Sequence, residues 1–258
     1  MADTTLTDLP AYDHRTGTGP TLVFLHYWGG SSRTWDLVLK RLPERDTLTL
    51  DFRGWGRSRD LSGPYTLRQL AADVLTVIED AGVDDYVLVG HSTGGEVAQL
   101  VAATQPAGLR GILLVGSGPA KPHEKITPEY QQVLSHAYDT AESIAGVRDH
   151  VLTATPLPQR LADRIVTDSL ASAEDARTEW PLRGIAEDVA EQTRAITVPA
   201  LVVAGERDAV EPVDVLRHNL MPFLDRAELQ VIPVTGHLIP FEAPEALADA
   251  IAAFEPAR

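Results

Sequence analysis

The sequence predicts an α/β fold with a mostly parallel central sheet, helices on both faces of the sheet and a helical cap inserted before the penultimate strand. Short, uniformly apolar runs alternate with segments of helical periodicity, which is typical of parallel strands joined by crossover helices. Between residues 119 and 197 the apolar runs stop, and prolines separate short amphipathic segments. We therefore expect a core built from residues 1–118 and 198–258 and a helical cap built from residues 119–197.

The N-terminal part of the core begins with a polar stretch, residues 1–20, that predicts one or two edge strands closed by a turn. The run TLVFLH at residues 21–26 is too short for a helix and uniformly apolar, as in a strand buried on both faces. The further elements expected before the cap are a helix from about residue 32, a strand at 47–51, a helix at 65–80, a strand from 87, the helix that leaves it and ends before 106, and a strand at 109–115.

Within the cap, three amphipathic pieces predict three to five short helices, and they lie at residues 130–144, 159–170 and 184–194. The strand pattern then resumes. The expected elements are a buried strand at 199–204 (PALVVA), a helix from about 213, a last strand at 228–234 and a closing helix at 244–254. Because the cap is inserted between two strands, we expect it to cover their carboxyl ends, where the sites of such sheets lie.

Length and composition restrict the class of protein. At 258 residues the chain can bury the core of one large domain. The absence of cysteine excludes disulfides, thiolate nucleophiles and thiolate metal sites, and we expect neither a metal nor a cofactor. The formal net charge of −15 disfavours nucleic acid and anionic membranes as partners and fits a small, neutral, apolar substrate.

The sequence carries no sign of a membrane span or of an export signal. No stretch approaches the roughly 20 apolar residues that cross a bilayer. The first residues, MADTTLTDLPAYD, are acidic and polar, whereas a signal peptide is basic and then apolar. We expect a cytoplasmic protein that is a monomer or a homodimer.

The turn around Ser92 is the first candidate for chemistry. The sequence GHSTGG at residues 90–95 stands between a strand pattern and a helical pattern. So tight a turn forces its central residue into a sparsely populated backbone region, at a cost of about 1–3 kcal/mol. The Oγ of Ser92 is therefore expected at the tip of the strand, beside the N–H groups that begin the next helix.

A serine hydroxyl needs a base to accept its proton, and histidine has a suitable pKa. His237 follows the last strand and a glycine, at the same end of the sheet as Ser92, whereas His26 also ends a strand but is interpreted as holding the adjacent loop. The imidazole in turn needs a carboxylate, and Asp208 follows the preceding strand. Glu206 is the alternative acid.

A tetrahedral oxyanion needs two N–H donors. The turn geometry offers the N–H of Thr93, the residue after the nucleophile, and the loop after the first buried strand offers the second, for which we favour Trp28. The alternatives for Trp28 are that it packs in the core, or that its indole lines the acyl pocket.

The chain resembles the α/β-hydrolases along nearly its whole length, in particular the lidded esterases, lactonases and cofactor-free haloperoxidases (perhydrolases). The order Ser92, Asp208, His237 is the chain order of that family. The matching landmarks are residues 26–30, 51–58 (DFRGWGRS), 90–95, 205–208 and 236–237. One departure is Tyr27, which stands where the family usually has glycine. Some relatives carry the acid after an earlier strand, near Ser117 here, but no carboxylate stands there.

The resemblance implies a serine hydrolase that cleaves a carboxylic ester or a lactone through an acyl-enzyme. The alternatives are perhydrolysis, cleavage of a carbon–carbon bond in a β-diketone, and a non-catalytic ligand receptor on the same fold. Haloalkane and epoxide chemistry is disfavoured, because those relatives place Asp where Ser92 stands. The expected substrate-binding residues are Tyr27, Trp55, Trp180, Tyr138 and Leu238. Other aromatic or imidazole side chains of the cap that are candidates to face the pocket are Tyr130, His123, His136 and His150.

Overall fold

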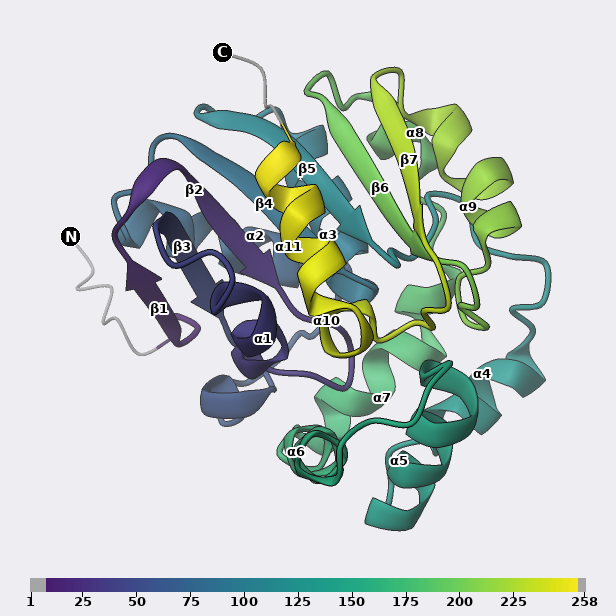
Figure 1. Ribbon diagram of the computed structural model, residues 1–258. Coiled ribbons are helices and arrows are strands. Elements are labelled where there is room, and N and C mark those ends of the chain that lie inside the picture. The colour runs from purple at the N-terminus through teal and green to yellow at the C-terminus, as the bar shows by residue number, and fades with distance from the viewer. Residues whose placement is uncertain (1–7, 255–258) are drawn as a thin grey trace.

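Figure 1 shows the computed structural model, which describes residues 8–254. A seven-stranded sheet runs through its centre in the order β1-β3-β2-β4-β5-β6-β7, and every neighbouring pair is parallel except β1 with β3. The strands are β1 (Tyr12–Arg15), β2 (Thr18–Leu25), β3 (Arg45–Leu50), β4 (Tyr86–His91), β5 (Leu109–Val115), β6 (Ala200–Gly205) and β7 (Ala227–Ile232). The predicted fold class is confirmed. The parts of the predicted core at residues 1–7 and 255–258 lie outside the described residues.

Helices cover both faces of the sheet (Figure 1). Those of the core are α1 (Asp36–Leu39), α2 (Leu67–Asp80), α3 (Thr93–Ala103), α9 (Val213–Asn219), α10 (Ile239–Glu242) and α11 (Pro244–Ala253). Two sequence-based expectations were wrong in extent. The helix expected from residue 32 is a 3-10 turn, Ser32–Trp35, followed by the single turn of α1. The last strand ends at Ile232, because Val234 adopts a positive φ of 57° that no strand accommodates.

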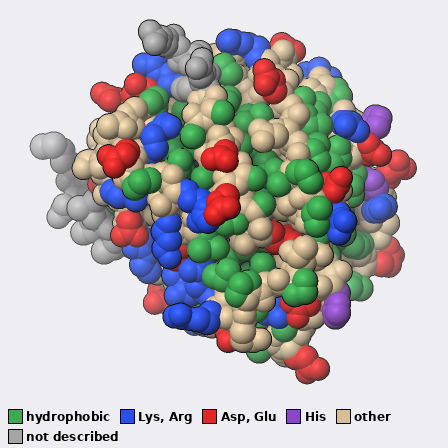
Figure 2. Space-filling model, viewed as in Figure 1, with side chains coloured by type: hydrophobic (Ala, Val, Ile, Leu, Met, Phe, Trp, Pro, Cys, Tyr) green, Lys and Arg blue, Asp and Glu red, His purple; other side chains and the backbone are tan. Residues whose placement is uncertain are grey.

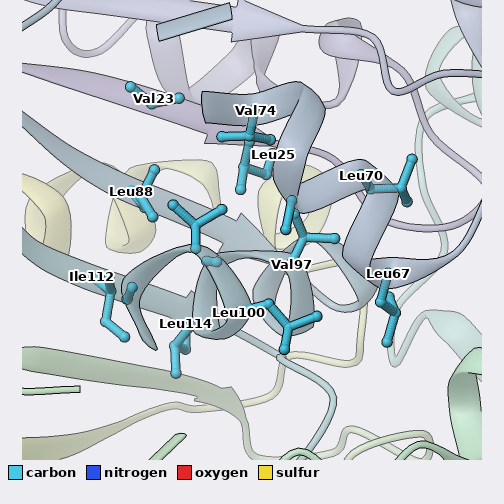
Figure 3. Close-up of a cluster of buried hydrophobic side chains, with 14 of the residues drawn as sticks. Val23, Leu25, Leu67, Leu70, Val74, Leu88, Val97, Leu100, Ile112 and Leu114 are labelled. Atoms are coloured by element: carbon cyan, nitrogen blue, oxygen red, sulfur yellow. The ribbon is translucent and has the colours of Figure 1, made fainter. Parts of the chain in front are cut away.

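Both faces of the central strands are buried, and alternate residues serve different clusters. Val23, Leu25 and Leu88 belong to the cluster under α2 and α3, part of which is drawn in Figure 3. Phe24 and Val89 point the opposite way, into the cluster under α1 and α11. This period of two explains why the strand sequences are continuously apolar and not alternating.

The chain between β5 and β6 is helical, as expected. Its elements are α4 (Pro128–Ser135), α5 (Ala141–Val147), a π-turn at Arg148–Leu152, α6 (Gln159–Leu170), α7 (Glu174–Leu182), a 3-10 turn at Gly184–Ala186 and α8 (Ala190–Arg194). The amphipathic piece at 130–144 is two helices and not one, because Thr140 starts a new helix with a capping box to Ser143. Figure 1 shows α4 to α7 beyond the carboxyl ends of the strands, whereas α8 packs against α3. We call α4 to α7 and their connections the helical insertion.

Ion pairs join α6 of the helical insertion to α1 of the core and to the 3-10 turn that precedes α1. Arg164 Nη1 lies 2.7 Å from Asp36 Oδ2, and Arg33 Nη2 lies 2.5 Å from Asp168 Oδ1. Figure 2 shows Lys and Arg side chains gathered over these two helices, with acidic and hydrophobic side chains around them. No helix among the described residues is long and apolar enough to cross a membrane.

Candidate active site

Ser92 lies in the strained turn that the sequence predicts. It connects β4 to α3 with φ 54° and ψ −120°, in a region that non-glycine residues rarely adopt. The turn closes because its neighbours lack side chains: a Cβ at Gly90 would fall 2.3 Å from the carbonyl oxygen of Gly94, and one at Gly94 would fall 2.4 Å from that of Leu25. The sequence around the serine therefore sets the backbone that holds its hydroxyl.

Three of the predicted residues form one chain of hydrogen bonds. The Nε2 of His237 lies 2.9 Å from Ser92 Oγ, and its Nδ1 lies 2.9 Å from Asp208 Oδ2. Asp208 follows β6 and His237 follows β7, so both lie at the carboxyl edge of the sheet with Ser92. Their side chains are almost fully buried.

Asp208 is held as a carboxylate. Burial alone raises its pKa, but His237 and the N–H groups of Val210 and Glu211, which donate to Oδ1 at 2.8 and 2.9 Å, outweigh burial and lower the pKa below its usual value. The alternative acid, Glu206, instead accepts a hydrogen bond from the N–H of Val234 at 2.9 Å. The ring of His237 therefore meets Asp208 and not Glu206.

His26 has the loop-holding position expected of it. Its Nδ1–H donates to the carbonyl of Tyr27 at 2.7 Å, and its Nε2 accepts from the N–H of Phe52 at 3.0 Å. Burial lowers the pKa of His26 to about 4, so the ring is neutral at pH 7. The loop after β2, which carries Trp28, is thereby fixed to the loop after β3.

Trp28 and Thr93 are the two predicted oxyanion donors. Neither backbone N–H donates a hydrogen bond to a backbone carbonyl of the described residues. Thr93 is the first residue of α3, where helical N–H groups lack partners. Trp28 is anchored on three sides: its indole donates to the carbonyl of Arg177 at 2.8 Å, its own carbonyl accepts from the indole of Trp55 at 2.6 Å, and Tyr138 stacks on its ring. Its backbone is thus held in place by the helical insertion as well as by the core.

Comparison with known proteins identifies the family. A model described as the alpha/beta hydrolase family matches residues 22–250. The chain belongs to this family. It is 27% identical over 245 residues to a non-heme haloperoxidase from Rhodococcus erythropolis, covering 86% of each chain. It is 29% identical over 244 residues to a 2-succinyl-6-hydroxy-2,4-cyclohexadiene-1-carboxylate synthase from Serratia proteamaculans, covering 89% of this chain and 90% of the relative.

The fold is shared with a solved esterase from Exiguobacterium antarcticum. The two superpose with a TM-score of 0.86 at 20% identity, over 94% of this chain and 93% of the esterase. Membership of the alpha/beta hydrolase family supports a hydrolase activity. No group of His, Asp or Glu among residues 8–254 of this hydrolase is arranged to hold a metal ion.

Four of the five expected substrate-binding residues divide into two sets in this hydrolase, and the fifth, Tyr138, stacks on the ring of Trp28. Trp55 and Trp180 line a small, apolar cavity together with Thr93. Tyr27 and Leu238 lie elsewhere, in a separate buried apolar cluster with Leu152, Ile165 and Phe241. The other candidates of the helical region lie at the surface or turn outward: His136 and His150 are exposed, Tyr130 is 43% exposed, and His123 accepts a hydrogen bond from Lys125 of its own turn.

Sequence reasoning missed three buried polar residues around Ser92. The Nε2–H of His91 donates to the carbonyl of His237 at 2.8 Å, and burial lowers the pKa of His91 to about 3. Glu96 and Glu211 are buried carboxyl side chains, Glu96 on the helix that follows Ser92 and Glu211 in the segment that follows Asp208. Their spacing was the available signal: Glu96 stands one helical turn after Ser92, and Glu211 stands three residues after Asp208.

Proposed function

We propose that the chain is a serine hydrolase that cleaves a carboxylic ester or a lactone through an acyl-enzyme on Ser92. The observation that carries this proposal is the continuous chain of hydrogen bonds from Asp208 through His237 to Ser92 Oγ, at 2.9 Å for each of its two steps. A nucleophile, a base within reach of it and a carboxylate that orients the base are the parts that acyl transfer requires.

In the proposed reaction, Ser92 Oγ attacks the carbonyl carbon while its proton passes to His237 Nε2. The N–H groups of Trp28 and Thr93 hold the oxyanion, and each such donor contributes about 10²–10³ in rate. The bond to the alcohol oxygen then breaks as His237 returns the proton to that oxygen. Water attacks the acyl-enzyme with His237 as base, and Ser92 regains its proton.

We propose that a short acyl group occupies the space beside Thr93, which has to widen for it because the cavity has room for only about one water molecule. The cavity there is small and bounded mainly by apolar side chains, among them Trp55, Leu67, Leu70 and Trp180. Because Trp180 belongs to the helical insertion, we propose that this insertion acts as a cap and sets the size of the acyl pocket. A small apolar acyl group agrees with the substrate expected from composition.

Perhydrolysis is the second candidate, because the chain is 27% identical to a non-heme haloperoxidase over most of its length. Hydrogen peroxide would replace water as the nucleophile that attacks the acyl-enzyme, so the same residues serve both reactions. The two activities are separated by adding peroxide and measuring peracid alongside the free acid.

The proposal is tested by stopped-flow hydrolysis of p-nitrophenyl acetate with the wild type and with Ser92→Ala. A burst of p-nitrophenol equal to the enzyme concentration, absent from Ser92→Ala, is expected. Mass spectrometry should find a fluorophosphonate adduct on Ser92. Ser58→Ala is the matched control for the loss of a buried hydroxyl, since Ser58 binds the backbone of Ala11 instead. If a broad panel of esters and lactones gives neither burst nor turnover, the chain is a ligand receptor and the proposal is wrong.

A further inference from the structure

The loop that carries His237 lies beyond the end of its strand. The pairing of β7 with β6 ends at Ile232, five residues before the histidine. On one side of the loop, the carbonyl of His237 accepts the hydrogen bond from His91 described above. On the other side, the N–H groups of His237 and Leu238 both donate to the carbonyl of Leu152, at 2.9 and 3.0 Å. Because Leu152 ends the π-turn of the helical insertion, the loop is held between the core and the insertion.

One carboxylate joins this loop to the insertion a second time. Glu242 ends α10, five residues after His237. Its Oε2 accepts the N–H of Gly236 at 2.9 Å. Its Oε1 accepts the N–H groups of Ala154 and Thr155 at 2.8 and 3.0 Å, and the hydroxyl of Thr155 at 3.2 Å. One oxygen therefore binds the residue before the histidine, and the other oxygen binds the insertion.

The contacts of Glu242 are those of a clamp and not those of a surface charge. The side chain is half-buried, and all four of its hydrogen-bond donors are backbone N–H groups or a hydroxyl. The two segments that it joins are in close contact, since a Cβ at Gly236 would fall 2.6 Å from the nitrogen of Ala154. Hydrogen bonds to an ionised acceptor are roughly twice as strong as neutral ones. Without the carboxylate, three N–H groups at this contact lose their acceptor.

The position of the His237 backbone matters because its ring has to meet Ser92. The Nε2 of His237 lies 2.9 Å from Ser92 Oγ, within reach of the proton that it would accept. Gly236 is the neighbour of His237 in the chain, so a shift of one moves the other. A misplacement of about 1 Å at a reacting group lowers the rate by about 10².

We propose that Glu242 is a positioning residue for the base. By binding Gly236 and the insertion at the same time, its carboxylate keeps the His237 ring at proton-transfer distance from Ser92. The proposal rests on the ester hydrolysis proposed above and goes beyond it, because it assigns part of the rate to a residue outside Ser92, His237 and Asp208. Glu242 belongs to the core and acts only through the loop of His237.

The first test measures acylation by p-nitrophenyl acetate in a stopped-flow instrument. Glu242→Ala is expected to lower the acylation rate constant at saturating ester, and kcat, by about 100-fold. The dissociation constant of the ester should stay within about twofold of the wild-type value, because ester binding does not require the base. Glu242→Gln keeps one acceptor oxygen, so its rate should be intermediate, about 10-fold below wild type. Glu245→Gln is the matched control and should keep the wild-type rate, since its side chain is 77% exposed.

The second test needs no substrate. Because Asp208 is a carboxylate, the proton between it and His237 lies on Nδ1. Proton NMR of the resting protein should detect it as a low-field resonance that is absent from His237→Gln. In Glu242→Ala this resonance should broaden or disappear through exchange with water, and in Glu245→Gln it should be unchanged. A residue that only stabilised the fold would lower the free energy of unfolding and leave the resonance and the acylation rate of the folded protein as they are.

The two tests separate this inference from the proposed function. If no ester is hydrolysed but the resonance depends on Glu242, the ester hydrolysis is wrong and the positioning role stands. If esters are hydrolysed and folded Glu242→Ala keeps the wild-type rate and resonance, the positioning role is wrong and the hydrolase stands. Should Glu242→Ala fail to fold, Glu242→Gln decides: a wild-type acylation rate overturns the proposal, and a 10-fold loss with an unchanged dissociation constant supports it.

Discussion

The carboxyl edge of the sheet and the helical insertion that lies beyond it are held in place in different ways. At the edge, Ser92, Asp208 and His237 follow β4, β6 and β7, and the N–H of Ser92 donates to the carbonyl of Val115 in the neighbouring strand at 3.0 Å. The insertion is joined to this edge by contacts outside the sheet. The hydroxyl of Ser169 donates to the carbonyl of Gly29 at 2.7 Å, the indole of Trp28 donates to the carbonyl of Arg177, and the N–H of His237 donates to the carbonyl of Leu152 at 2.9 Å.

This difference separates chemistry from substrate choice. The nucleophile, base and acid proposed for bond cleavage follow strands of the sheet, whereas Trp180 of the insertion lines the apolar cavity beside Thr93 and donates to Glu96. Substitutions at the edge should therefore cost much activity or stability, and substitutions at the junction should cost little while changing which substrates bind. The predictions below test this contrast, beginning with the largest expected effect.

Asp208→Asn is expected to lower kcat for ester hydrolysis by about 10⁴, because an amide neither stabilises the protonated imidazole nor holds its tautomer. The measurement is steady-state hydrolysis of p-nitrophenyl acetate. Glu206→Gln is the matched control and should retain wild-type activity, since Glu206 binds the N–H of Val234 and not His237. A large loss in Glu206→Gln with a small one in Asp208→Asn would move the acid to the other carboxylate.

Gly94→Ala and Gly146→Ala compare one helical glycine at the edge with one in the insertion. A Cβ at Gly94 would fall 2.4 Å from the carbonyl oxygen of Leu25, so the free energy of unfolding of Gly94→Ala should be about 3 kcal/mol lower than that of the wild type. A Cβ at Gly146 would meet nothing within 4 Å, and Ala in helix α5 should add about 0.5–1 kcal/mol. Urea unfolding measures both, and equal effects would contradict the contrast.

The free energy of unfolding should fall less steeply between pH 6.5 and pH 8 in Glu96→Gln than in the wild type. The folded protein keeps a proton on Glu96 up to a pKa of about 8, whereas the unfolded chain has already released it, so wild-type stability falls as pH increases. Each pH unit is worth about 1.4 kcal/mol, which gives a difference of about 2 kcal/mol between wild type and variant over this window.

The window begins at pH 6.5 because buried His26 and His91, with pKa values of about 4 and 3, act in the opposite direction below it. Each ring stays neutral in the folded protein but takes up a proton in the unfolded chain, so the free energy of unfolding decreases as pH falls. Urea unfolding at pH 6.5 and 8 is the measurement, and Glu191→Gln, whose side chain is 89% exposed, should keep the wild-type slope. A variant slope equal to that of the wild type would mean that Glu96 is ionised throughout this range.

Ser169→Ala has the smallest expected effect. It removes one buried hydrogen bond between α6 and the loop after β2, a loss of about 1 kcal/mol. In hydrogen exchange, the free energy of opening of α6 should decrease by this amount, while the amides of the strands keep their protection. Ser135→Ala, whose hydroxyl binds only the carbonyl of Gln132 in its own helix, is the control. Loss of protection in β4 or β5 would show that the insertion and the sheet open together.

The sequence by itself determined the sheet and the edge. Strands buried on both faces are continuously apolar, and the glycines around Ser92 leave only one kind of turn, so both can be recognised from local pattern. The chain order of Ser92, Asp208 and His237 then followed from which strand each one ends. These features depend on residues close together in the sequence.

Only the tertiary structure decided what surrounds Ser92. No local pattern shows that Tyr27 and Leu238 lie in a cluster apart from Trp180, or that the side chains of Glu96 and Glu211 are both buried. Short helices joined by irregular turns can pack in many ways, and side-chain contacts between distant segments select one of them. The surroundings of Ser92 depend on those long-range contacts, and for that physical reason the sequence predicted the sheet and its carboxyl edge more fully than what surrounds Ser92.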